Sequence, residues 1–323
     1  MKQVGRVIYW LLLALVAAMS ALCAEHKSAK DQKHDPDQIG NRDVGKGVNL
    51  YSIEKEIGLG REMAQEVERE TKLADDPVVT EYVSRLGQNL VRNSDAKVPF
   101  TIKVIDSEEV NAFALPGGFM FVNTGLIMRT ENEAELAAVL AHEISHVAAR
   151  HGTRQASRAQ LFNYGSIPLI FMGGWAGYAI RQAVSLAVPM GFMKFSRSME
   201  SEADMLGLQY LYKSGYDPTE FVNFFERIQT VEKKKPGSIS RLFSTHPMTG
   251  DRIRAAQKEI QNDLLPVPQY VVDTSEFHEV RDRLTMLGSR RLLHSDPTLP
   301  VLIKRPASSV DQAGDDRPTL KRQ

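Results

Sequence analysis

The sequence contains a single cysteine in 323 residues, and it has no net charge because 40 Lys and Arg balance 40 Asp and Glu. One thiol cannot form an intramolecular disulfide or a cysteine metal site, so a bound metal must be held by His and carboxylates. The absence of a basic surplus, and of Lys/Arg clusters with interleaved aromatic residues, argues against nucleic-acid binding. The remaining composition, 42% hydrophobic and 25% charged, is typical of a soluble globular protein.

The first 24 residues differ from the rest of the chain. Lys2 and Arg6 precede an uncharged run of about 18 residues that ends in small side chains, which is the order of a secretory signal peptide. A single membrane-spanning helix is the alternative, since about 18 apolar residues is the lower limit for crossing a bilayer. Cys23 lies at the end of the run, where it is either removed with the signal or retained as a lipid anchor, although Leu22 precedes it in place of the usual Gly or Ala. We expect export to the periplasm or cell envelope.

Composition divides the rest of the chain into four parts. Residues 25–50 are polar and rich in Lys, Asp and Gly, which indicates a linker. Residues 51–265 contain the periodic apolar segments and form the expected domain. Residues 266–300 are a C-terminal extension. Residues 301–323 are polar with few large apolar side chains, and we expect them to be disordered.

The expected domain combines helices with a small sheet. Helical spacing begins at Ser52 and again at Pro77, and the alternating segment 100–105 predicts a strand. Two further short strands, 111–115 and 119–122, flank a Pro-Gly-Gly break. Helices are predicted over 198–213, 221–235 and 251–260. The fold class is therefore α+β, mostly α.

Residues 142–146 have the sequence HEISH. A capping box at 130–133 and Gly152, suited to a left-handed helix end, predict one helix of about 21 residues around them. His142 and His146 point only about 40° apart on such a helix, so both imidazoles can reach one ion at about 2.0–2.1 Å. Glu143 is turned about 100° from His142, which suits a general base and not a ligand.

A catalytic zinc needs a third protein ligand and an open position for water. His151 lies nine residues after His142 and should face away from it on a continuous helix. Glu200 shares a helix face with Asp204 and with small residues that allow close packing, so we predict Glu200 as the third ligand. Asp204 is then placed to accept the free ring N–H of a zinc-bound histidine. Glu202, turned about 200° from Glu200, is expected to point to solvent.

Several ordered motifs over roughly residues 50–265 resemble the M48 peptidases. They are NAFALPGGFMFVNTGLI, HEISH, VAARHG, ESEAD and THPMTGDRI. The resemblance implies a zincin-like metallopeptidase domain of the gluzincin type, with a small sheet beside the HExxH helix and one Zn²⁺ per chain. It implies His142, His146 and Glu200 as zinc ligands and Glu143 as the catalytic base. Within the family the chain is similar to the exported BepA/LoiP/Oma1-like branch, but no tetratricopeptide repeats are recognisable after about residue 270.

The strand segment before the zinc helix has two interpretations. It either supplies an edge along which an extended substrate pairs, or forms part of the core only. The residues concerned are Asn111, Ala112, Phe113 and Ala114.

Two features outside the motif helices remain open. Residues 161–193 are apolar but broken by Gly and Pro, and they form either a flap over the cleft that also touches the membrane surface or a buried hairpin. His246 lies in the THP loop, where it reaches the zinc in a resting state or stabilises the oxyanion of the transition state. The alternative is that His246 only bonds its neighbours.

Together these features predict an exported, zinc-dependent endopeptidase. By resemblance, its substrates are unfolded or misassembled envelope proteins, and its role is protein quality control. The alternative is a zinc-stabilised, chaperone-like binding module that rarely cleaves.

Overall fold

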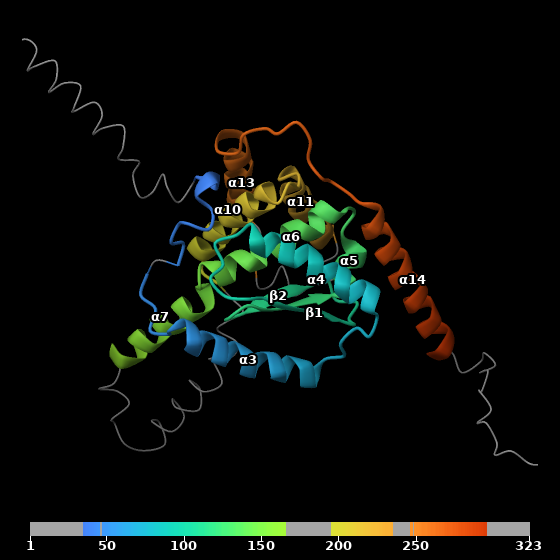
Figure 1. Cartoon of the computed structure of the whole chain (residues 1–323), viewed down its shortest axis with the longest axis horizontal. Coiled ribbons are helices and arrows are strands. Elements are labelled where there is room, and N and C mark those ends of the chain that lie inside the picture. The colour runs from blue at the N-terminus through green and yellow to red at the C-terminus, as the bar shows by residue number, and fades with distance from the viewer. Residues whose placement is uncertain (1–34, 46, 166–194, 235–245, 248, 296–323) are drawn as a thin grey trace, which may run out of the picture. The chain divides into compact units, whose positions relative to one another are not determined.

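The computed structural model describes residues 35–45, 47–165, 195–234, 246–247 and 249–295 (Figure 1). The predicted signal peptide, most of the apolar segment 161–193 and the polar tail lie outside these residues. The chain divides into two compact units, 1–284 and 285–323. The site and its supporting elements belong to the first unit.

A three-stranded sheet lies at the centre of this unit. It consists of β1 (Thr101–Ile105), β2 (Ala112–Leu115) and β3 (Phe119–Asn123), in the order β1-β3-β2. β1 is parallel to β3, and β2 is antiparallel to it, so β2 forms an edge of the sheet. The turn between β2 and β3 contains Gly117 with φ 75°, a conformation that favours glycine. These strands confirm the three predicted extended segments.

Helices cover both faces of the sheet (Figure 1). α3 (Ile53–Glu70) lies on one face, and α4 (Pro77–Arg92) and α6 (Glu133–Ala148) lie on the other. The further helices of the described chain are η1 (Pro36–Gln38), α5 (Thr124–Arg129), α7 (His151–Gly165), α10 (Arg197–Lys213), α11 (Thr219–Lys234), α13 (Gly250–Asn262) and α14 (Ser275–Ser295). This mostly helical architecture with one small sheet confirms the predicted α+β class.

Successive side chains of β3 point to opposite faces of the sheet. Phe121 packs with Ala64 of α3, whereas its neighbours Met120 and Val122 join the larger core with α4 and α6. α6 is buried along its whole length. The HEISH segment is therefore surrounded by protein on every side, where a polar side chain needs a partner.

α6 is shorter than predicted at both ends. Its N-cap is Asn132, whose side chain accepts a hydrogen bond from the Glu135 backbone N–H at 2.9 Å, so the predicted capping box at 130–133 was misplaced by two residues. The helix stops at Ala148, and the left-handed residue is Arg150 with φ 55°, not Gly152. The chain turns there and starts α7 at His151. The prediction of one continuous helix was therefore wrong.

Arg150 occupies this unfavourable conformation because its side chain is held at two points. Its Nε donates to Glu56 Oε2 at 2.7 Å, and its Nη2 donates to the Tyr51 carbonyl oxygen at 2.7 Å. A left-handed conformation costs a residue with a Cβ about 1–2 kcal/mol, so the turn is stabilised by contacts that the local sequence does not reveal.

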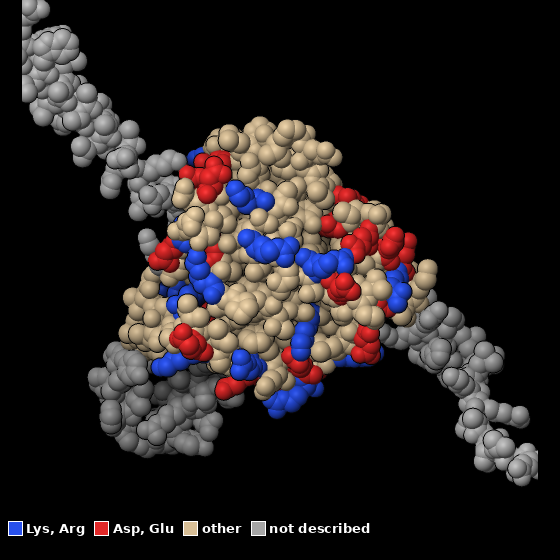
Figure 2. All heavy atoms as spheres, in the orientation of Figure 1, with Lys and Arg blue, Asp and Glu red and all other residues tan. Residues whose placement is uncertain are grey.

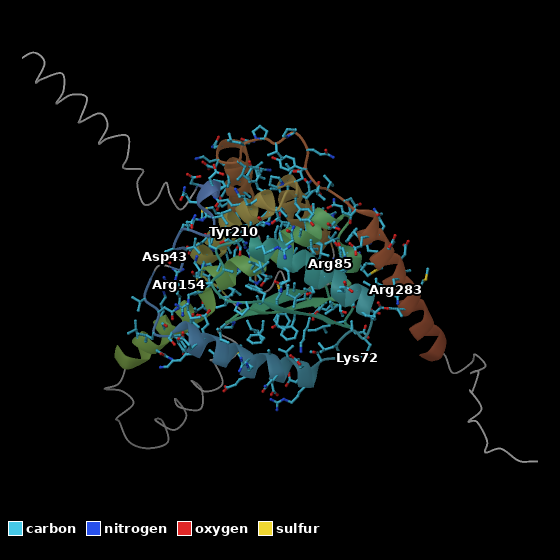
Figure 3. All side chains as sticks on the ribbon, viewed as in Figure 1. Asp43, Lys72, Arg85, Arg154, Tyr210 and Arg283 are labelled. Atoms are coloured by element: carbon cyan, nitrogen blue, oxygen red, sulfur yellow. The ribbon has the colours of Figure 1, made fainter. Side chains whose placement is uncertain are left out.

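The segments on either side of the domain contact it. Arg42, within the predicted linker, forms a buried ion pair with Asp95 at 2.8 Å, and Asp95 also accepts from the Tyr210 hydroxyl at 2.9 Å. At the other end, Phe277 of α14 is buried in the core, and Arg283 pairs with Asp76 at 2.6 Å. Figure 3 labels Tyr210, left of the middle of the view, and Arg283, at the right. The domain boundaries remain a prediction.

The surface carries both signs of charge. On the face shown in Figure 2, Lys and Arg are interspersed with Asp and Glu. Exposed ion pairs of the described chain include Arg85 with Glu81, 3.2 Å apart. Such pairs contribute little to stability, so the fold depends on its core.

Candidate active site

Close packing of α10 on α6 creates the site. A Cβ placed on Gly207 would lie 3.1 Å from the His142 Cα, so only glycine permits this approach without a shift. The approach brings Glu200 and Asp204, one turn apart on α10, against the two histidines of α6. This agrees with the predicted shared face of Glu200, Asp204 and small residues.

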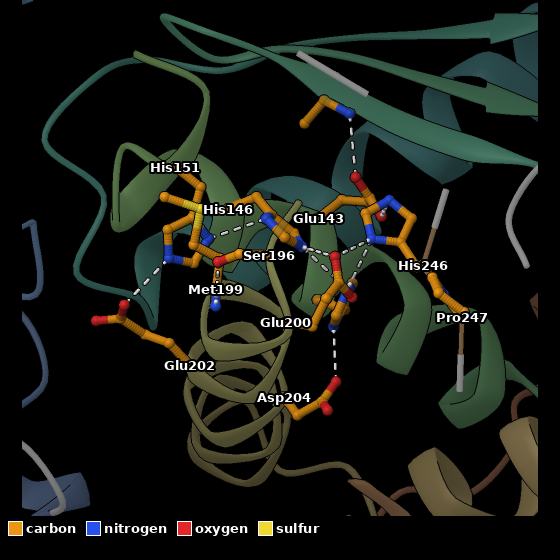
Figure 4. Close-up of polar contacts among 12 residues, drawn as sticks. Glu143, His146, His151, Ser196, Met199, Glu200, Glu202, Asp204, His246 and Pro247 are labelled. Atoms are coloured by element: carbon orange, nitrogen blue, oxygen red, sulfur yellow. Dashed lines mark hydrogen bonds and ion pairs between the residues drawn. The ribbon is translucent and has the colours of Figure 1, made fainter. Parts of the chain in front are cut away.

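Four side chains meet in a buried cluster (Figure 4). They are His142, His146, Glu200 and His246, and one ligand atom from each lies within 4.8 Å of the others. The two Nε2 atoms of His142 and His146 are 3.1 Å apart. His246 Nδ1 lies 3.4 Å from His142 Nε2 and 2.9 Å from Glu200 Oε1. Glu200 Oε1 is 3.7 Å from His146 Nε2.

These separations fit a tetrahedral zinc site. Ligand atoms at about 2.0–2.1 Å from one ion lie about 3.3 Å from one another, close to the observed distances. Three imidazoles and a carboxylate are also a donor set that zinc accepts. Among the described residues, the buried Glu143 Oε1 beside the cluster has no hydrogen-bond partner, which leaves an acceptor available to a small molecule there.

Glu143 connects the cluster to the sheet edge. Its Oε2 accepts a hydrogen bond from the Ala114 backbone N–H of β2 at 3.2 Å, and its Oε1 lies 3.6 Å from His246 Nε2. Burial raises the pKa of this carboxyl group above its ordinary value. Of the four predicted edge residues, Asn111 immediately precedes β2, and Ala112, Phe113 and Ala114 lie within it.

An ion-pair network supports the His142 side of the cluster. His142 Nδ1 lies 3.1 Å from Asp204 Oδ1, and Arg252 of α13 holds both Asp204 oxygens at 2.6 Å. Arg252 also pairs with Glu200 at 3.0 Å. Sequence reasoning did not single out Arg252, although it lies in the quoted segment THPMTGDRI.

This network sets the charges of the buried groups. Burial alone would lower the pKa of His142, but Asp204 and Glu200 outweigh it and raise that pKa to about 9. Burial alone would raise the pKa of Glu200, but hydrogen bonds with His142 and His246 hold it well below its ordinary value. Glu200 is therefore an anion, as a ligand carboxylate must be.

Two further predictions about this region were wrong. His151 does not face away, because the turn at Arg150 brings its Nδ1 to 2.9 Å from His146 Nδ1. Glu202 does not point to solvent: its side chain is 14% exposed, and its Oε2 lies 3.2 Å from His151 Nε2. His151 is nevertheless not one of the four clustered residues. Burial lowers the pKa of both His146 and His151, which keeps these rings neutral.

A small pocket adjoins the cluster between β2 and α6. Its lining includes Ala114 and Leu115 of β2 together with His146 and Arg150. A buried donor set of three histidines and a glutamate, beside an edge strand and a pocket, is the arrangement of a metallopeptidase.

The chain belongs to peptidase family M48, which it matches over residues 77–260. Relatives named as bacterial beta-barrel assembly-enhancing proteases and as a mitochondrial metalloendopeptidase confirm the expected similarity to the BepA and Oma1 proteins. The chain is thus placed among the peptidases by family.

Three relatives illustrate the extent of the similarity. The beta-barrel assembly-enhancing protease of Escherichia coli K12 is 32% identical over 289 residues, covering 86% of this chain and 58% of the relative. That of Yersinia pestis is 33% identical over 237 residues, covering 70% and 48%. The mitochondrial metalloendopeptidase OMA1 of Schizosaccharomyces pombe is 32% identical over 203 residues, covering 62% and 57%. The chain thus spans about half the length of these relatives.

Within the described residues, no helix is both long and apolar enough to cross a membrane.

Proposed function

We propose that this protein is a zinc-dependent endopeptidase that hydrolyses peptide bonds in unfolded or misassembled proteins of the bacterial cell envelope. The observation that carries the proposal is the convergence of His142, His146 and Glu200 beside Glu143 in one buried cluster. These four residues come from two helices that are separated by some fifty positions in the sequence. Membership of a metallopeptidase family supports the same assignment.

Each residue of the cluster has a distinct role in this proposal. His142 and His146 hold one Zn²⁺ through their Nε2 atoms, and Glu200 holds it through a carboxylate oxygen. The ion supplies Lewis-acid polarisation of the substrate carbonyl and lowers the pKa of water. Glu143 would take the proton of the attacking water at Oε1, the oxygen without a hydrogen-bond partner in the described structure, and pass it to the leaving amine. Asp204 orients the His142 ring through Nδ1.

His246 is assigned to a resting state of the enzyme. Its Nδ1 lies within 3.4 Å of both His142 Nε2 and Glu200 Oε1, so it occupies the fourth corner of the cluster, where water or substrate must enter. Movement of the His246 side chain then frees that corner. Stabilisation of the oxyanion is the second role for the same side chain, after this movement.

The outer edge of β2 is assigned to substrate binding. The Ala114 N–H points away from β3 toward Glu143, so an extended peptide paired with this edge lies beside the cluster. The residues Asn111, Ala112, Phe113 and Ala114 would then position the scissile bond. Binding a peptide along β2 requires little ordering of the protein, because this strand is already formed.

The location and substrate class rest on the N-terminal targeting pattern and on the relatives. The order of charged, apolar and small residues in 1–24 supports export to the periplasm, with lipid anchoring through Cys23 as the variant form. Relatives that are named for enhancing β-barrel assembly support an envelope substrate and a quality-control role. Peripheral contact of residues 161–193 with the membrane remains part of this proposal.

The test compares proteolysis with metal content. We expect the purified protein to degrade casein, a chelator to abolish this activity, and added Zn²⁺ to restore it. Glu143→Gln should lower the rate by at least about 100-fold while zinc content stays at one per chain. Glu66→Gln, an exposed glutamate of α3, is the matched control and should leave the rate unchanged.

The rival function is a zinc-stabilised, chaperone-like binding module. It predicts that the wild type binds unfolded proteins without chelator-sensitive cleavage and that Glu143→Gln changes nothing. That result, with full zinc occupancy, would replace the peptidase assignment.

A further inference from the structure

His151 is a fully buried histidine that the proposed chemistry does not use. Its relative exposure is 0%, and its two ring nitrogens face different partners. Nδ1 lies 2.9 Å from His146 Nδ1, and Nε2 lies 3.2 Å from Glu202 Oε2. Arg154 Nη1 donates to the same Glu202 oxygen at 3.3 Å. We call His151, Glu202 and Arg154 the relay (Figure 4 shows the first two).

The ring protons of His146 and His151 can be placed in one consistent way along the relay. His146 turns Nε2 toward the cluster, so a metal there takes the Nε2 lone pair and the ring proton stays on Nδ1. His151 must then accept at its own Nδ1, and its proton resides on Nε2. That proton points at the Glu202 carboxylate, to which Arg154 also donates. Every donor in the series therefore meets an acceptor.

A break in the helix places His151 next to His146. On a continuous helix it would lie about 140° round from His146 and could not reach it. The left-handed Arg150 interrupts the helix immediately before His151. Phe195 stacks on the His146 ring, with centroids 4.1 Å apart and planes at 22°, which restricts the rotation of that ring.

We propose that His151 is a positioning residue for the metal centre, which fixes the tautomer and orientation of His146 by transmitting the charge of Glu202. His151 does not touch the ion. It makes His146 a better ligand by holding the Nδ1 proton, as a carboxylate does directly for other ligand histidines. The inference rests on the proposed metal site.

The test measures zinc affinity by competition with a chromogenic chelator, together with melting of the metal-free protein. His151→Leu keeps the apolar volume but removes the acceptor, and we expect zinc affinity to fall about 10- to 100-fold. His151→Asn retains an acceptor oxygen near the position of Nδ1 and should recover much of the affinity. Glu202→Gln should cause a smaller loss, of about 3- to 10-fold, because His151 still accepts from His146.

Controls separate a positioning role from a structural one. His278→Ala alters an exposed histidine paired with Asp273 and should change neither affinity nor melting. A purely structural His151 would lower the melting temperature of the metal-free Leu and Asn variants alike, with no recovery of affinity in Asn; that result overturns the inference. The inference is also overturned if Glu202→Gln and His151→Asn both bind zinc with wild-type affinity. This holds whether His151→Leu folds and binds zinc tightly or fails to fold.

The proposed function fails by a different outcome. If the wild type binds no zinc under these conditions, the metal site itself is wrong. If the wild type binds one zinc and the relay variants bind it with the same affinity, the metal site stands and the proposed role of His151 is wrong.

Discussion

The two histidines of HEISH are supported in different ways. His142 meets a carboxylate directly, at 3.1 Å from Asp204, and Arg252 holds that carboxylate with two contacts of 2.6 Å. His146 instead contacts the imidazole of His151, and the carboxylate of Glu202 lies behind that ring. Both arrangements nevertheless end in an Asp or Glu of α10 paired with an arginine.

The difference follows from the path of α10 over α6. Gly207 brings α10 into contact at His142, so Asp204 reaches that ring without an intermediary. His146 lies one turn further along α6, where Glu202 points to the other side of α10 and toward α7. His151 fills the gap between Glu202 and His146. Alternate residues of one helix, Glu200, Glu202 and Asp204, thereby serve the ligand cluster and both its supports.

The largest effect is expected from breaking the direct support. Asp204→Asn removes the carboxylate of His142 and one of the two anions that neutralise Arg252, which is 5% exposed. We expect zinc affinity to fall by more than about 10-fold and the free energy of unfolding by about 3 kcal/mol. Chelator competition measures the zinc affinity, and urea unfolding measures the free energy of unfolding. A loss smaller than that of Glu202→Gln would contradict the ranking of the supports.

A double variant separates charge burial from ligand support. Adding Arg252→Met to Asp204→Asn removes the cation left without its main partner, so about 2 kcal/mol of stability should return. Zinc affinity should stay low because His142 still lacks its carboxylate. The double-mutant cycle uses the same unfolding and affinity measurements. Recovery of affinity along with stability would mean that Asp204 acts only through Arg252.

The direct support was largely predictable from the sequence, and the relay was not. Asp204 follows Glu200 by one helical turn, so helix periodicity alone places it on the same face. The relay depends on the turn at Arg150, which two contacts with remote residues, Glu56 and Tyr51, stabilise. A left-handed arginine has no local sequence signal, whereas Gly152 two residues later offers a misleading one. His246 and Arg252 come from distant segments, and only the motif resemblance indicated their region.

The same contrast applies to the fold. The strands and the starts of α3 and α4 were predicted because strand alternation and helical spacing from Ser52 and from Pro77 are local signals. The contact of Arg42 with Asp95 joins residues 53 positions apart, which composition cannot reveal.

A third prediction tests the close approach that makes the direct support possible. Gly207→Ala adds a Cβ that lies 3.1 Å from the His142 backbone, so α10 must shift by a few tenths of an ångström. We expect a loss of about 1–2 kcal/mol in unfolding free energy and weaker zinc binding. Gly288→Ala is the matched control, because no heavy atom lies within 4 Å of its added Cβ. Equal effects at both glycines would contradict the packing argument.

The smallest effect concerns the turn that makes the relay possible. Arg150→Ala and Arg150→Gly both remove the contacts with Glu56 and Tyr51, but only alanine must strain to keep φ near 55°. Glycine should therefore leave the protein more stable than alanine by about 1 kcal/mol in urea unfolding. It should also bind zinc more tightly, because the unstrained turn still delivers His151 to His146. Equal values for the two variants would show that the turn survives without its left-handed residue, and the relay would then have to be held by α7 alone.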